Sequence, residues 1–270
     1  MIAFVVAAAL PIICLQECAL EGRKKLDEPK VESRMNEASA TRSPWIISNG
    51  AKILRDPTGK YFYPVSGRSA AIAVAESFVF HADSLVQANA DGAADAEKMK
   101  TFLAALPVAN LPPVVDLVVI DDGSAQTSEV MNLLVRRNLL FRPVQKAEKA
   151  KLVVQIGSHD FPKAAAANPS DFAVLVRRKL TDEKRSLRVY GSENVIARLE
   201  SDGRTARLHV LNYGQRPVEG IRFRVSGKYK NANLNAFGVP GAQVQEMMVD
   251  GDSTEFTVLE LRQYAVVDLH

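Results

Sequence analysis

The chain has 270 residues, which is more than one average domain needs, since domains cluster near about 100–200 residues. Hydrophobic residues make up 47% of it and charged residues 24%, which excludes collagen, wholesale disorder and a multi-pass membrane protein. The 34 basic and 31 acidic side chains leave a net charge of only +3, so we do not expect nucleic acid as a partner.

Residues 1–20 have the composition of a signal or anchor segment. An apolar run extends from Ile2 to Leu15, which is shorter than the roughly 20 residues that cross a membrane and matches the apolar region of a secretory signal. This pattern favours an extracytoplasmic or secreted protein that contacts a membrane only through this segment. No basic residue precedes the run and no Ala-x-Ala site follows it, so the alternatives are a buried segment or an arbitrary start within a longer chain.

The cysteines and the charged segment that follows them set the expected limits of the folded part. Cys14 and Cys18 are the two cysteines, so the later residues have no thiol for catalysis, zinc binding or a disulfide framework. We therefore predict no cofactor and no metal site. Residues 21–44 are rich in alternating charge and contain no aromatic side chain. Such a segment buries too little surface to offset its ordering entropy, which predicts a flexible linker.

Strand and helix patterns alternate between residues 45 and 190, which is typical of an α/β domain with a parallel sheet. The segments 52–55 and 60–63 flank a turn sequence that contains proline and glycine, and they predict a hairpin. The spacing of apolar residues predicts helices over 69–86 and 95–106.

A strand, helix, strand unit follows, of the size of a parallel crossover. Extended segments are predicted at 114–120, 139–144 and 152–156. Two helices begin where Ser124 and Asn168 can cap their first turns. We expect this α/β pattern to end near residue 190.

Beyond Gly191 the apolar period changes from 3.6 to 2. The turn dipeptides Asp202-Gly203 and Asp250-Gly251 lie between alternating segments, and six or so short strands are expected without a helix between them. Residues 191–270 therefore predict a small antiparallel β-sandwich. Its aromatic residues are either core residues or faces for sugar stacking: Tyr213, Tyr229, Phe237 and Tyr264.

Polar residues follow two of the predicted parallel strands, where ligands gather in open α/β sheets. These candidate ligand-binding residues are Asp121, Asp122, Ser124, Ser158, His159 and Asp160. If the two strands are neighbours, three acids, a histidine and two hydroxyls share one crevice that suits acid–base work. The sequence around Asp122 also resembles the acidic loop of GT-A glycosyltransferases that use nucleotide sugars. The alternative is that both segments are ordinary polar turns, with Ser124 as a helix cap.

The C-terminal strands resemble the terminal sandwich of multidomain bacterial glycoside hydrolases. The resemblance rests on the strand patterns of residues 207–213, 218–225, 256–258 and 264–269. In the beta-galactosidase-like members, a catalytic barrel is followed by an α/β domain similar to class I glutamine amidotransferases and then by such a sandwich. The resemblance implies an amidotransferase-like or flavodoxin-like parallel-sheet domain here. It lends no catalytic residue, because the catalytic glutamates of that family belong to a barrel that this chain has no room for.

Three functions follow as hypotheses. The first is a glycoside-hydrolase-like auxiliary protein without catalysis, which binds carbohydrate or a partner subunit. The second is an enzyme acting at the Asp121/His159 crevice, such as a nucleotide-sugar glycosyltransferase. The third is a structural module for homo-oligomer formation. The sequence contains no catalytic set that we recognise, and it leaves an enzymatic and a non-catalytic reading open.

Overall fold

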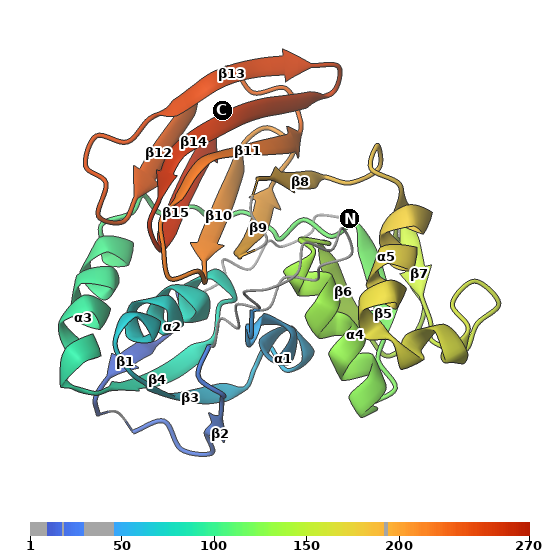
Figure 1. Cartoon of the computed structure of the whole chain (residues 1–270), viewed down its shortest axis with the longest axis horizontal. Helices are drawn as coiled ribbons and strands as arrows, with labels where there is room; N and C mark the ends of the chain where they lie inside the picture. Colours follow the sequence, from blue (N-terminus) through green and yellow to red (C-terminus); the bar gives the residue numbers. More distant parts are fainter. Residues whose placement is uncertain (1–9, 18, 30–45, 192–193) are drawn as a thin grey trace, which may run out of the picture.

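The computed structural model describes residues 10–17, 19–29, 46–191 and 194–270. It combines two parallel sheets and their helices with two antiparallel sheets that pack as a sandwich (Figure 1). The predicted combination of an α/β part and a β-sandwich is therefore present. Within the described ranges, no helix is long and apolar enough to span a membrane.

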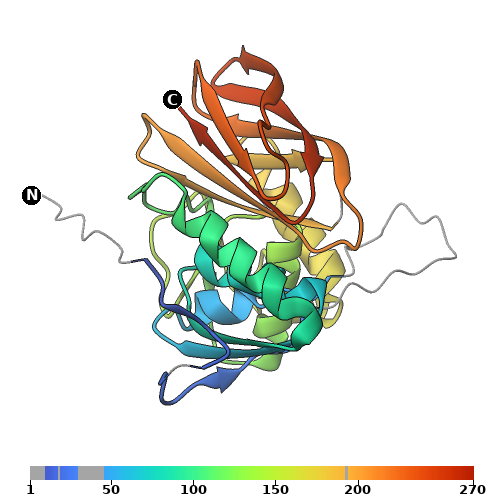
Figure 2. The same cartoon turned by 90° about the vertical axis from the view of Figure 1, so that its left-hand side faces the viewer.

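The first parallel sheet has helices on one face. Its strands, in spatial order, are β1 (Ile13–Leu15), β4 (Asp83–Ala88), β3 (Lys60–Val65) and β2 (Lys24–Lys25). Helices α2 (Arg68–Val79) and α3 (Ala90–Ala104) lie between this sheet and the sandwich (Figure 2). Tyr61 and Tyr63 are buried toward the helices, whereas Phe62 between them points to the opposite face, as strand alternation requires.

That opposite face is unusual, because parallel sheets are normally covered on both faces. No helix among the described residues lies against it, and the chain passes beneath it from β1 at one edge to β2 at the other (Figures 1 and 2). We call this side of the sheet the open face. It was not anticipated, since residues 1–20 and 21–44 were expected to form a leader and a linker. The described parts of both segments instead supply strands, and Cys14 in β1 is disulfide-bonded.

The second parallel sheet has the order β6 (Phe141–Val144), β5 (Leu117–Ile120), β7 (Leu152–Val154). Helices α4 (Ala125–Arg136) and α5 (Pro169–Leu180) pack together beside it, and a short 3-10 helix, η1 (Lys163–Ala167), precedes α5. Both predicted caps are confirmed. The Ser124 hydroxyl accepts from the Thr127 amide, and the Asn168 side chain accepts from the amides of Ser170 and Asp171.

Two local predictions were wrong. Residues 52–55 do not form the first half of a hairpin but lie in helix α1 (Gly50–Arg55). Tertiary contacts decide this, because the Glu76 carboxylate binds the Asn49 amide at the start of α1. The predicted helix over 69–86 ends at Val79, and the remainder is β4. His81, just past the helix, adopts φ +54°, the left-handed conformation in which many helices end. Because no glycine or proline marks this position, the sequence did not indicate the end of the helix.

The sandwich consists of two four-stranded antiparallel sheets. One has the order β12 (Ala232–Ala236), β15 (Tyr264–Leu269), β10 (Ala206–Asn212), β9 (Val195–Ser201), and the other β13 (Val244–Asp250), β14 (Ser253–Leu261), β11 (Val218–Ser226), β8 (Leu187–Tyr190). The sequence pattern placed the residues of β8 at the end of the α/β part. It pairs instead with β11, so the sandwich begins before Gly191.

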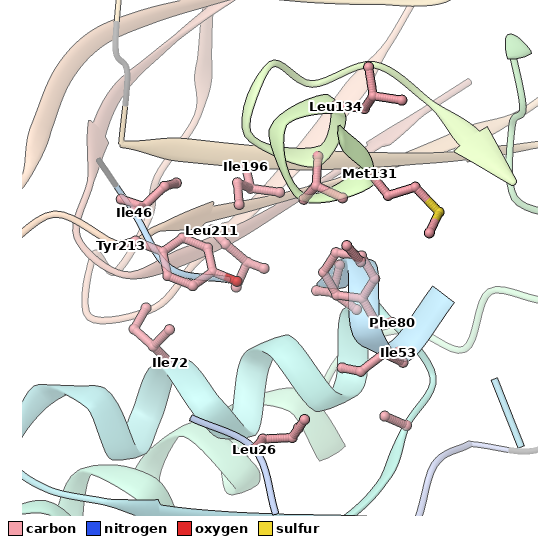
Figure 3. Close-up of a cluster of buried hydrophobic side chains, with 14 of the residues drawn as sticks. Leu26, Ile46, Ile53, Ile72, Phe80, Met131, Leu134, Ile196, Leu211 and Tyr213 are labelled. Atoms are coloured by element: carbon pink, nitrogen blue, oxygen red, sulfur yellow. The ribbon is translucent and has the colours of Figure 1, made fainter. Parts of the chain in front are cut away.

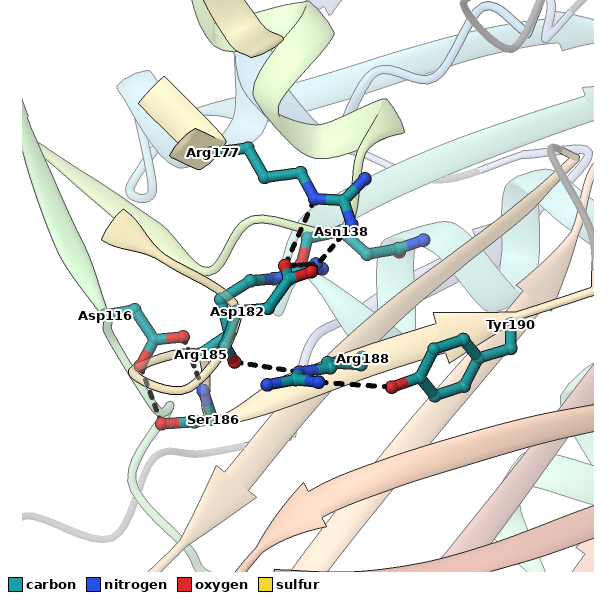
Figure 4. A network of polar contacts seen from close by, with 8 residues as sticks. All are labelled: Asp116, Asn138, Arg177, Asp182, Arg185, Ser186, Arg188 and Tyr190. Atoms are coloured by element: carbon teal, nitrogen blue, oxygen red, sulfur yellow. Dashed lines mark hydrogen bonds and ion pairs between the residues drawn. The ribbon is translucent and has the colours of Figure 1, made fainter. Parts of the chain in front are cut away.

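Polar contacts tie β8 to the second parallel sheet (Figure 4). Asp116, just before β5, accepts from the Ser186 amide at 2.9 Å and from the Ser186 hydroxyl at 2.6 Å. Lys151 donates to the same carboxylate at 2.7 Å. The Asp182 carboxylate accepts from Arg177 and Arg185, and its carbonyl accepts from Arg188 in β8. The junction between α5 and the sandwich is therefore stabilised by ion pairs and by hydrogen bonds to carboxylates.

One hydrophobic core joins the α/β part to the sandwich. Figure 3 shows sandwich residues meeting residues of α1, α2 and α4. The buried side chains from these sources include Ile53, Ile72, Met131, Leu134, Ile196, Leu211 and Tyr213. A second cluster fills the space between the two sandwich sheets. The residues before Gly191 and the residues after it therefore share one hydrophobic core.

Candidate functional site

The acidic residues that follow β5 are engaged in local structure. Asp121 is 9% exposed and forms a two-pronged ion pair with Arg55, in which both N–O distances are 2.7 Å. It also accepts from the Gly123 amide at 3.0 Å. The hydrogen bond from Arg55 is the main reason that the pKa of Asp121 lies below its usual value. Asp121 therefore fixes α1 to the second sheet.

Asp122 and Ser124 form the turn into α4. The Asp122 carboxylate accepts from the Ser124 amide at 3.0 Å, and hydrogen bonds from Ser124 and Thr127 lower the pKa of Asp122 to about 2. The Ser124 hydroxyl is occupied by the first turn of α4. These are the contacts of a capped helix start.

The residues after β7 are also in a polar turn. Strand order places β7 beside β5, so both loops leave the same edge of the sheet. Ser158 accepts from the Phe161 amide at 3.3 Å, Asp160 pairs with Lys179 at 2.5 Å, and the His159 side chain is fully exposed. In the described chain, no hydrogen bond or ion pair joins this loop to Asp121, Asp122 or Ser124. A shared ligand crevice of these six residues stays a prediction.

A cleft lies on the open face of the first sheet. It has a volume of about 570 Å³ and is lined by Gln16, Glu17, Arg23, Lys25, Phe62, Leu85 and Gln87. Two further clefts adjoin it. One shares Lys25 with it and the other shares Gln87 with it, and the two have Pro64 in common. The cleft that contains Gln87 extends past the carboxyl ends of β3 and β4. We call these three adjoining clefts together the open-face groove. Carboxyl ends of parallel strands are where ligands bind in open α/β sheets.

The floor of the groove is apolar and its rim is polar. Phe62 and Leu85 are register partners on β3 and β4, and Lys25 of β2 is the partner of Phe62 on the other side. The Arg23 guanidinium lies over the Phe62 ring, 5.9 Å from its centroid. This distance is within the range of a cation–π contact.

Two rim side chains, Gln16 and Glu28, are held by hydrogen bonds near the ends of β4 and β3. Gln16 donates to the Ala88 carbonyl at 3.0 Å, which joins the end of β1 to the end of β4. Glu28 accepts from the Ser66 hydroxyl at 2.8 Å and from its amide at 3.3 Å. The groove thus offers amide, carboxylate and cationic groups around an aromatic floor. Among the described residues, no group of histidine, cysteine or acidic side chains could hold a metal ion.

Sequence reasoning missed this groove for a specific reason. Four of its residues, Gln16, Glu17, Arg23 and Lys25, lie in the segments expected to be a leader and a linker. Strand β2 has only two residues, which is too short to give a periodic signal. The alternation of Tyr61, Phe62 and Tyr63 was a usable signal, because it places one aromatic ring opposite the other two.

Three of the four aromatic residues considered for sugar stacking are buried in the core. Tyr213, Tyr229 and Tyr264 are 4%, 3% and 0% exposed, so the core reading holds for them. Phe237 packs against the shared core.

Comparison with known proteins shows a similarity of fold alone. No protein-family model and no curated protein sequence matches the chain. Among solved structures, α-L-fucosidase isoenzyme 2 from Paenibacillus thiaminolyticus is similar, with a TM-score of 0.59, 10% identity and coverage of 78% of this chain. This chain spans 60% of the length of that fucosidase chain. An α-amylase from H. orenii is matched over 83% of this chain and 51% of its own, with 11% identity and a TM-score of only 0.21.

Proposed function

We propose that this chain is a glycoside-hydrolase-like auxiliary protein that binds an oligosaccharide in the open-face groove without cleaving it. The observation that carries the proposal is a parallel sheet whose second face has no helix against it among the described residues and carries polar side chains around an aromatic floor. The similarity of the fold to that of a fucosidase supports it.

The lining suits a sugar for two chemical reasons. A pyranose ring has an apolar face that packs on rings and aliphatic side chains such as Phe62 and Leu85, and hydroxyls around its edge. Gln16, Gln87 and Glu17 provide donors and acceptors for such hydroxyls. A pocket that is apolar at its base, with a few convergent polar groups, is the usual form of a small-ligand site.

Cleavage needs more than the groove supplies. Hydrolysis of a glycosidic bond uses two carboxyl groups that flank the bond, one as acid and one as base or nucleophile. The described acids along the groove are Glu17, Asp27 and Glu28. Asp27 is paired with Lys52 at 2.7 Å, and Glu28 is held by Ser66. This leaves Glu17 as the acid without a described partner, and we therefore propose binding alone.

The test measures thermal stability and binding heat with neutral and acidic oligosaccharides, starting with fucosyl-oligosaccharides. A bound glycan at 100 times its Kd stabilises the folded state by about 2.7 kcal/mol. We expect Gln87→Ala to weaken binding about tenfold and Tyr190→Ala, which removes an exposed ring on the sandwich, to leave it unchanged. The proposal fails if no oligosaccharide stabilises the protein, if Gln87→Ala binds like the parent, or if reducing ends are released on incubation.

A further inference from the structure

The open-face groove extends along β3 toward the carboxyl end of that strand. Side chains of a strand alternate between its two faces, so Phe62 and Pro64 follow one another on the open side of β3, and Ser66 follows just past its end. From Phe62 to Ser66 an extended chain covers about 13 Å, at about 3.3 Å per residue. The groove is therefore longer in this direction than one sugar ring.

Strand β4 lines the same path. Phe62 is the register partner of Leu85, and Pro64 is the partner of Gln87. We call the cleft over Phe62 the near cleft and the cleft past the carboxyl ends of β3 and β4 the far cleft. Gln87 lines both of them, so the two clefts adjoin at its side chain, and Asn89 lines the far cleft two positions later.

The sizes of the two clefts bear on what fills them. The near cleft has a volume of about 570 Å³ and the far cleft one of about 400 Å³. Sites for small ligands have roughly 300–1,000 Å³. Each cleft alone thus has the size of a small-ligand site, and a single sugar would leave one of them empty.

The far cleft also has polar groups of its own, and contacts within the protein hold them in place. Glu28 accepts from the Ser66 hydroxyl at 2.8 Å, and the Asn89 side-chain oxygen accepts from the Gly67 amide at 3.3 Å. A carboxylate has further lone pairs, and the amide group of asparagine has two N–H donors. The far cleft can therefore bind sugar hydroxyls in addition to those bound near Phe62.

We infer that the oligosaccharide in the open-face groove lies along β3 and occupies the near and the far cleft with consecutive sugar units. The protein then recognises a stretch of glycan chain and not a single sugar. The inference rests on the proposed function and adds the class of ligand to it. The loss of overall freedom on binding is incurred once for the whole chain, so each further unit that makes contacts should raise the affinity until the groove is filled.

The experiment measures the binding heat of the whole chain with ladders of neutral oligosaccharides. Fuco-, cello- and xylo-oligosaccharides are each titrated from the monosaccharide to the hexasaccharide. In at least one ladder we expect the affinity to rise about tenfold or more from the disaccharide to the tetrasaccharide and then to level off. If the disaccharide binds as tightly as the hexasaccharide in every ladder that binds, this inference is overturned and the proposed function stands. Binding of no ladder overturns the proposed function and this inference with it.

Variants assign the effect of length to the far cleft. Ser66→Leu removes a hydroxyl and fills part of this cleft, so the tetrasaccharide should lose most of its advantage over the disaccharide. Asn89→Ala should act in the same direction and provides a second test. Phe62→Ala removes the aromatic floor and should weaken the binding of every length.

Ser226→Leu is the matched control. Like Ser66, Ser226 is an exposed serine at the end of a strand, but it lies in β11 of the sandwich. We expect this variant to keep the full gain of affinity with chain length. A gain that survives both Ser66→Leu and Asn89→Ala overturns the inference.

Discussion

At the scale of single residues, Glu76 on α2 connects parts of the chain that are far apart in sequence. Its side chain has no solvent exposure, and it accepts from the Ser48 hydroxyl at 2.8 Å, the Asn49 amide at 2.9 Å and the Tyr63 hydroxyl at 2.9 Å. The Tyr213 hydroxyl, from the sandwich, donates to the same carboxylate. Burial, together with the negative charge of Glu76, holds the pKa of both tyrosines well above their usual value. One buried charge thus organises α1, β3 and the sandwich.

We expect Glu76→Ala to lower the free energy of unfolding by about 3–5 kcal/mol, because it leaves several buried donors without an acceptor. Tyr213→Phe removes one donor and should cost about 1–2 kcal/mol. Urea denaturation measures both. Glu97→Ala, at an exposed position of α3, is the control and should change stability by less than about 0.5 kcal/mol. A loss below 1 kcal/mol in Glu76→Ala would contradict the structural role.

At the scale of elements, strand β9 is the edge of its sheet, and the α/β part covers it. The Asn138 side chain, just past α4, donates to the Val195 carbonyl at 3.0 Å and accepts from the Ala197 amide at 2.7 Å. Further along, the Val114 amide donates to the Leu199 carbonyl at 2.8 Å. The edge therefore has partners for its backbone groups, which an uncovered edge strand lacks.

Asn138 adopts φ +54°, which asparagine tolerates better than most residues. We expect Asn138→Ala to cost about 2–4 kcal/mol through lost hydrogen bonds and backbone strain, and Asn138→Gly to cost less because only the bonds are lost. Asn110→Ala, at an exposed position, is the matched control. Denaturant unfolding of the three variants ranks them, and equal stability of the alanine and asparagine forms would show that the contact does not matter.

The elements that could be predicted are those whose signal is local. The side chains of Ser124 and Asn168 cap helices by accepting from backbone amides two or three residues away, and the strand alternation after Gly191 depends on neighbours in sequence. Helix α1 and strands β1 and β2 could not be predicted, because contacts with Glu76 and with β3 and β4 create them. The candidate site shows the same limit: the local position of a residue could be predicted, but its long-range partner could not. Asp121 was found as a strand-end acid, but its partner Arg55 lies 66 residues away.

At the scale of the whole molecule, a histidine network links α2 to the sandwich. The Glu200 carboxylate lies 2.8 Å from His81 Nε2 and 3.7 Å from His209 Nε2, and His209 Nδ1 is 2.8 Å from the Tyr264 hydroxyl. Burial lowers the pKa of His209, against the opposing effect of Glu200. Hydrogen bonds from His209 and His81 lower the pKa of Glu200 to about 2, although burial alone would raise it.

These shifts predict the direction of acid sensitivity. His209 binds a proton more readily in the unfolded chain, so stability is highest above the unfolded value near about 6.5 and falls as the pH drops below it. Glu200 adds a loss of its own between about pH 4.5 and 2, where the unfolded chain protonates first. We expect the urea midpoint to fall between pH 7.5 and 5.5, and His209→Gln to flatten that fall. A parent protein with the same midpoint at both pH values would refute the assignment.

The place of β8 has a consequence for dividing this molecule. The chain leaves α5, contributes β8 to one layer of the sandwich, and only then enters the other layer at β9. A cut at Gly191, where the sequence pattern changes, would take an edge strand away from the C-terminal piece and leave β9 of that piece bare. Fragments cut at Gly191 are therefore expected to be incomplete and prone to association through their bare strand edges. The molecule has to be expressed or transferred as one unit.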